Sequence, residues 1–102
     1  MIVVRDIFQL KFGKAKDALA LMKEAQPMMS KNGYSVDRIM TDFTGPYYTL
    51  VMESSYGSLS HYDKAYKTEV AEDEWKKWYQ RFVPLVESGR REIYTVVDQT
   101  KR

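Results

Sequence analysis

The stretch YSVDRIMTDFTGPYYTLVMES, residues 34–54, decides the fold, because it has the pattern of two strands joined by a turn. Residues 34–43 and 47–54 are rich in β-branched and aromatic side chains, and Thr44-Gly45-Pro46 supplies turn chemistry between them. We therefore predict an antiparallel hairpin in the middle of the chain. Its second half is the most apolar of the predicted strands and is expected to lie in the centre of a sheet.

A strand and a helix are predicted before this hairpin. Residues 2–12, IVVRDIFQLKF, contain the Val, Ile and Phe side chains that favour a strand. Residues 14–31 place apolar side chains at three- and four-residue spacing, which is typical of an amphipathic helix. Pro27 is expected to kink this helix near its end, and Asn32-Gly33 is expected to terminate it, since both residues tolerate left-handed backbone.

Two consecutive helices and a last strand are predicted after the hairpin. Ser58 or Ser60 is expected to cap a helical region that bends near residues 68–72. Gly89 is expected to end the second helix, and residues 91–99 are expected to form the fourth strand. The last three residues, Thr100 to Arg102, are expected to be frayed.

The order strand, helix, strand, strand, helix, strand predicts a ferredoxin-like α+β fold with a four-stranded antiparallel sheet. We expect a single domain that spans residues 1–102. Right-handed crossovers place the helices on one face of the sheet, which leaves the other face uncovered. Apolar residues such as Val51 and Met52 stand on both faces of the predicted strands, so the open face is expected to be largely apolar. Since monomers rarely expose so large an apolar patch, we expect a homodimer through the open sheet face.

Composition excludes several classes of function. The 102 residues include no cysteine, which excludes disulfides, Cys-ligated metals and thiol catalysis. Sixteen basic and fourteen acidic residues give a net charge of +2, which is too balanced to indicate nucleic-acid binding. No apolar run approaches the ~18 residues of a membrane span. We expect a cytoplasmic protein without a metal or a cofactor and without nucleic-acid or membrane partners.

Residues 5–14, RDIFQLKFGK, resemble the start of the NIPSNAP-like family, in which an arginine and an aromatic residue precede Pro-Gly and the first helix. Phe8 and Gly13 match this pattern, Phe12 replaces the proline, and Arg5 stands one residue farther from the glycine. The resemblance implies a dimeric α+β barrel, in which two ferredoxin-like subunits pack sheet to sheet. The same superfamily includes cofactor-independent monooxygenases, haem-degrading enzymes and members without known chemistry, so the fold alone does not select an activity.

The candidate ligand site is expected between the strands and the second helical region. It is expected to include Phe8, Tyr48, His61, Trp75 and Trp78. His61, the only imidazole, would act as a haem ligand or general base, although a partly exposed helix residue is the interpretation we favour. The two tryptophans would be apolar walls of a pocket, although core packing is the commoner use of such a pattern.

Charged residues fall inside the predicted strands and beside the helical bend. Arg5, Asp6, Asp37 and Arg38 are expected to form ion pairs, with binding of an anionic group as the alternative. The acidic residues within 69–74 are expected to be a solvated helix start rather than a cation site.

We therefore expect the protein to bind a small apolar or aromatic molecule in a helix–sheet cleft. The alternatives are a monooxygenase, either cofactor-independent or haem-degrading with His61 as ligand, and a purely structural dimerisation module. An open cavity with converging polar groups would favour binding or catalysis. A cleft filled by its own side chains would favour the structural module.

Overall fold

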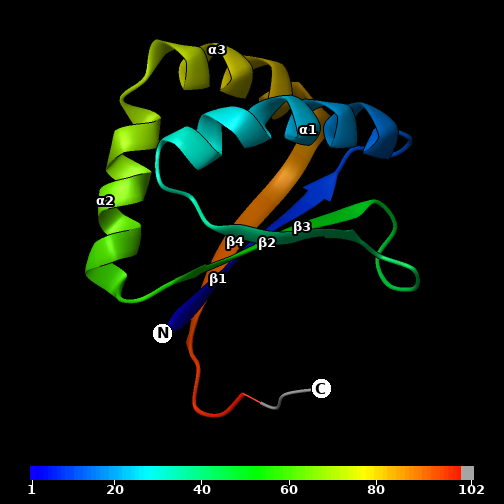
Figure 1. Ribbon diagram of the computed structural model, residues 1–102. Helices are drawn as coiled ribbons and strands as arrows, with labels where there is room; N and C mark the ends of the chain where they lie inside the picture. Colours follow the sequence, from blue (N-terminus) through cyan, green and yellow to red (C-terminus); the bar gives the residue numbers. More distant parts are fainter. Residues whose placement is uncertain (100–102) are drawn as a thin grey trace.

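The computed structural model describes residues 1–99, which form a sheet with helices over one face (Figure 1). The strands are antiparallel in the order β2-β3-β1-β4, so β3 and β1 are central. This arrangement confirms the predicted ferredoxin-like fold. The expected frayed end at residues 100–102 lies outside the described residues. The elements are β1 (Ile2–Leu10), α1 (Ala15–Lys31), β2 (Val36–Thr41), β3 (Thr49–Tyr56), α2 (Leu59–Val70), α3 (Asp73–Phe82), the 3-10 turn η1 (Val83–Leu85) and β4 (Val86–Thr95).

Side-chain alternation along the central strands separates the two faces of the sheet. On β1, Val4 and Leu10 are buried beneath the helices, and the register places Leu50 and Met52 of β3 on the same face. Phe8 also points to this side, because it packs against the core formed with α1 and α3. The even-numbered residues of β1 and β3 therefore form the floor of the core.

The helices cover this floor with residues at helical spacing. Six residues of α1 are buried, and each Leu or Met among them contributes about 1.5–3 kcal/mol by leaving water. Pro27 lies inside α1, and the helix continues past it to Lys31. The buried residues of α1 are Ala18, Leu21, Met22, Ala25, Met28 and Met29.

None of the helices within residues 1–99 has the length and apolar composition needed to cross a bilayer. The cytoplasmic location stays a prediction.

The second helical region contains the predicted bend. Ser58 caps α2, since its side chain accepts a hydrogen bond from the backbone N–H of His61 at 3.2 Å. Helix α2 ends at Val70, and Glu72 is the cap residue from which α3 starts. The two helices are therefore separate elements, as expected.

The end of α3 and the start of β4 lie earlier than predicted. Helix α3 ends at Phe82, because Pro84 in η1 has no N–H with which to continue an α-helical hydrogen-bond ladder. β4 begins at Val86 rather than at residue 91. Gly89, which was expected to end the helix, lies inside this strand opposite Phe8.

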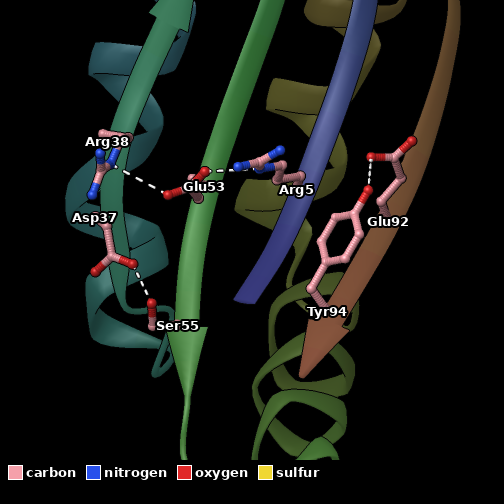
Figure 2. Close-up of polar contacts among 7 residues, drawn as sticks. All are labelled: Arg5, Asp37, Arg38, Glu53, Ser55, Glu92 and Tyr94. Carbon is pink, nitrogen blue, oxygen red and sulfur yellow. Dashed lines mark hydrogen bonds and ion pairs between the residues drawn. The ribbon is translucent and has the colours of Figure 1, made fainter. Parts of the chain in front are cut away.

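The open face of the sheet carries a row of ion pairs (Figure 2). Glu53 on β3 lies between Arg5 on β1, with Nε and Oε2 2.9 Å apart, and Arg38 on β2, with Nε and Oε1 3.3 Å apart. At the same face, the Ser55 hydroxyl donates a hydrogen bond to the Asp37 carboxylate. Three of the four strand charges singled out in the sequence thus form polar contacts on this face.

The open face is therefore more polar than the sequence analysis expected. Leu50 and Met52 belong to the core, and only their neighbour Val51 lies on the open side. On β4 the same side carries Glu92, which accepts a hydrogen bond from the Tyr94 hydroxyl at 2.7 Å (Figure 2). The expectation was wrong on this point because it assigned apolar strand residues to both faces without the register that separates them.

Gly89 provides a test of this packing. A Cβ at position 89 would lie 3.0 Å from Cδ1 of Phe8, whose ring is held edge-on against Phe82 with centroids 5.1 Å apart. We predict that Gly89→Val lowers the free energy of unfolding by about 1–3 kcal/mol through overpacking, as measured by urea denaturation. Gly57→Ala is the control, because its Cβ would meet only Nδ1 of His61 at 3.9 Å. Equal stabilities of the two variants would contradict the close packing.

Candidate functional site

A cavity of about 480 Å³ lies between the helices and the sheet. Its size falls within the roughly 300–1,000 Å³ typical of small-molecule sites. Strands β1, β3 and β4 form one side of it, and α1, α2 and α3 form the other. The lining residues that carry aromatic or polar chemistry include Asp6, Phe8, Tyr34, Tyr66, Glu69, Trp75, Trp78 and Arg91.

Aromatic side chains of α3 form one wall of the cavity. Trp75 stacks on Tyr79 with ring centroids 4.7 Å apart, and Trp78 stacks on Phe82 at 5.0 Å. Phe8 meets Phe82 edge-on from the sheet. These contacts arise because residues three and four apart share a helix face, which brings the successive rings together.

The two tryptophans have different roles in this wall. The indole N–H of Trp78 donates a hydrogen bond to the backbone carbonyl of Leu21 on α1, at 2.7 Å. Trp78 thereby connects α3 to α1, in addition to lining the cavity. Trp75 is partly buried, packs against the core and stacks on Tyr79, which is exposed at the rim.

An ion pair also lines the cavity. Nε of Arg91 on β4 lies 2.6 Å from Oδ1 of Asp6 on β1, and Asp6 is only 5% exposed. The Arg91 guanidinium also lies 4.9 Å from the centre of the Tyr66 ring. Burial acts to lower the pKa of Arg91, but the hydrogen bond and charge of Asp6 outweigh it and raise that pKa. Arg91 therefore stays charged beside the carboxyl group of Asp6.

Glu69 is a second buried carboxyl in the cavity wall, and it corrects an expectation. It lies near the end of α2 and is 1% exposed, whereas the sequence suggested a solvated position. Nδ2 of Asn32 donates a hydrogen bond to its Oε2 at 3.0 Å. Burial raises the pKa of Glu69, and the charges of Glu72 and Glu74 raise it further. The hydrogen bond from Asn32 lowers this pKa but does not outweigh burial.

A tyrosine adds a neutral donor to this polar end. Burial is the main cause that raises the pKa of Tyr34, and the neighbouring Tyr62 and Tyr56 add to it. The phenol of Tyr34 is therefore protonated at every pH at which the protein would be studied. Within residues 1–99, no group of three His, Asp or Glu residues is positioned to hold a metal ion.

The structure brings together three of the five residues predicted for the site. Phe8, Trp75 and Trp78 line the cavity. Tyr48 lies elsewhere, in a surface hollow beside the β2–β3 turn. His61 is exposed in the first turn of α2 and does not line the cavity. Whether the three grouped residues contact a ligand stays a prediction.

The position of His61 bears on the haem interpretation. Its ring lies edge-on to Tyr56 with centroids 6.0 Å apart, on the surface side of α2. An axial ligand must reach the iron of a haem held in the cavity. His61 does not fit that role.

Sequence reasoning missed Glu69 and Arg91 for different reasons. The buried residues of α2 are Tyr62, Ala65 and Glu69, so Glu69 occupies the apolar stripe at a spacing of three and four. That spacing was a signal in the sequence from which the burial of Glu69 could have been predicted. Arg91 faces the cavity only because β4 pairs it with Asp6, and this register depends on where α3 ends.

Several known proteins share this fold. A model of the NIPSNAP family matches residues 5–100. An uncharacterized NIPSNAP domain protein from Burkholderia xenovorans has a TM-score of 0.89 at 17% sequence identity, over 100% of both chains. A NIPSNAP family protein from Agrobacterium tumefaciens has a TM-score of 0.87 at 20% identity, over 95% of this chain and 93% of that one. A putative antibiotic biosynthesis monooxygenase from Nitrosomonas europaea has a TM-score of 0.74 at 13% identity, over 96% of this chain and 100% of that one. No curated protein matches the chain.

The raised pKa of Glu69 predicts how stability changes with pH. An unperturbed glutamate titrates near 4.5, so the folded chain holds this proton to higher pH than the unfolded chain does. The resulting stabilisation is present below about pH 4.5 and is lost as the pH rises through the folded-state pKa. We predict that the wild type loses stability relative to Glu69→Gln over that range, as measured by urea denaturation at a series of pH values. Parallel curves for the two proteins would refute the raised pKa.

Proposed function

Because the chain belongs to the NIPSNAP family, as residues 5–14 indicated, we propose a function for its cavity: it binds a small apolar or aromatic molecule. The observation that carries the proposal is a space of about 480 Å³ that the surrounding side chains do not fill. A concave, mainly apolar space of this size with a few polar groups is the usual form of a small-molecule site.

The walls of the cavity indicate how the molecule would lie. The stacked rings of Trp75 and Trp78 offer flat apolar surfaces for a ring system or an aliphatic body. Asp6, Arg91 and Glu69 lie among the lining residues, where they offer hydrogen bonds to a polar group of the same molecule. A few polar groups in a mainly apolar cavity are the usual arrangement for orienting a small ligand.

A cofactor-independent monooxygenase is the second candidate function. It is favoured by the fold shared with the putative antibiotic biosynthesis monooxygenase from Nitrosomonas europaea. In this case the molecule bound in the cavity would react with dioxygen. Uptake of dissolved oxygen in the presence of a bound aromatic compound would distinguish this function from binding alone.

We also propose that two copies pair through the open sheet face. Glu53 retains only 11% of its side-chain exposure, although the helices of its own chain lie on the other side of the sheet (Figure 2). Its negative charge is neutralised by Arg5 and Arg38, and the three side chains together keep one positive charge. Ile7 and Val51 pair with each other across β1 and β3, two residues along from the Arg5–Glu53 pair, and supply apolar area. A surface with these properties is suited to association.

The ligand hypothesis is tested by substituting the two tryptophans separately. We predict that wild-type protein binds 1-tetralone, a compact ring ketone, with one-to-one stoichiometry by calorimetry. Trp75→Ala should weaken this binding about fivefold or more with little loss of stability, because Trp75 stacks near the rim. Trp78→Ala should cost about 3–5 kcal/mol of stability, because it also removes core packing and the bond to Leu21.

Tyr47→Ala is the matched control for Trp75→Ala. Tyr47 is an exposed aromatic residue that does not line the cavity, so its loss should leave binding unchanged. Equal affinities of the wild type, Trp75→Ala and Tyr47→Ala would show that the compound binds outside the cavity.

The association hypothesis is tested at Val51. An interface of this kind should bury well over ~1,000 Å² and give a dimer at micromolar concentration. We predict that Val51→Arg shifts the mass measured by light scattering from twice that of one chain to that of one chain. Gln80→Arg, on the exposed side of α3, should leave the mass unchanged. A monomeric wild-type protein would contradict the proposal.

A further inference from the structure

Glu69 presents a hydrogen-bonding atom that the described chain leaves without a partner. Its side chain lines the cavity and is 1% exposed. Oε2 accepts the hydrogen bond from Asn32 Nδ2, whereas Oε1 has no partner within residues 1–99. Buried polar atoms are rarely unpaired in folded proteins, and an unpaired one is costly. Oε1 is therefore the atom of the wall whose hydrogen bond a bound molecule can complete.

The surroundings of Glu69 favour the uncharged acid. The nearby Lys31 makes its ion pair with Glu72, with Nζ and Oε2 3.4 Å apart. Burial raises the pKa of Glu69, so its protonated form is reached more readily than that of an exposed glutamate. Because Asn32 donates to Oε2, the proton of the acid form resides on Oε1. The free atom is then a donor that requires an acceptor.

The remaining charges of the cavity compensate one another. Arg91 is paired with Asp6 at 2.6 Å, and the other charged lining residues besides Glu69 are one acid, Glu87, and one base, Arg90. An anionic ligand would have to compete with the Asp6 carboxylate for Arg91, and a cationic ligand would have to compete with Arg91 for Asp6. The cavity is thus suited to an uncharged molecule.

We propose that Glu69 determines ligand specificity by donating a hydrogen bond from Oε1 to the carbonyl oxygen of an uncharged, largely apolar molecule, such as a ring ketone. This inference rests on the proposed binding function. Oε1 is covered in this structure, so the carboxyl must turn about its terminal torsion, which has a broad range, to meet a ligand, and Oε2 shifts against Asn32 in that turn. Met29, which also lines the cavity, has a flexible side chain that accommodates such a turn.

Matched compounds test the role of Glu69. 1-Tetralone and tetralin have the same ring skeleton, and only the ketone has an acceptor oxygen. The wild type should bind the ketone about tenfold more tightly in calorimetry, as expected for one buried hydrogen bond. Glu69→Gln should retain the preference, because its amide offers both an acceptor for Asn32 and a donor in place of Oε1. Glu69→Leu should reduce the preference to about twofold or less.

Two further measurements make the test specific. The carbonyl stretching band of bound 1-tetralone should shift to lower frequency in the wild type and not in Glu69→Leu. Asp63→Leu is the control, since Asp63 pairs with Lys67 on the exposed side of α2 and does not line the cavity, and it should keep both the preference and the shift. Glu69→Gln and the comparison of the two compounds on the wild type keep the inference testable if Glu69→Leu fails to fold, since equal binding of both compounds to the wild type would overturn it.

The outcomes separate this inference from the function on which it rests. If neither compound binds to the wild type, the proposed binding function is refuted, and the inference with it. If both compounds bind equally well, binding in the cavity stands and the role of Glu69 is overturned, as would follow if a buried water satisfied Oε1. A ketone preference that survives in Glu69→Leu would likewise overturn it.

Discussion

The strict alternation of side chains along β1 is the constraint on which the rest of the structure depends. Two adjacent residues of opposite charge, Arg5 and Asp6, point to opposite faces of this central strand. Arg5 pairs with Glu53 on the open face, and Asp6 pairs with Arg91 beneath the helices. A shift of one residue in register would bury the wrong charge on each side, so both neighbouring strands are held in one alignment.

The element order was accessible from the sequence because each local signal agrees with the final fold. The turn at Thr44-Gly45-Pro46, the cap at Ser58 and the bend between α2 and α3 are determined by nearby residues. The start of β4 was misplaced because Pro84 ends α3 early, whereas Gly89 looked like a helix terminator. That glycine is required by the ring of Phe8, which comes from a strand far away in the sequence. No local pattern contains this information.

The candidate site shows the same division between local and tertiary information. Trp75 and Trp78 follow from helical periodicity, and Phe8 follows from alternation in β1. The polar residues of the cavity follow from tertiary contacts: Asn32 explains why Glu69 is tolerated in the core, and β4 brings Arg91 to the site. Residue type alone was a poor guide, since the single histidine is on the surface.

The hydrogen bond from Trp78 to the backbone of α1 bears on how a ligand would enter and leave the cavity. Because it fastens α3 to α1, these two helices stay together while the bond is intact. A molecule bound as proposed would pass the side chains at the rim, where Tyr79 and Val83 are exposed. Turning of exposed side chains occurs within picoseconds to nanoseconds, whereas displacement of helices takes microseconds or longer. If exchange requires only the turning of side chains, the residence time of a molecule bound as proposed would be set by its contacts inside the cavity.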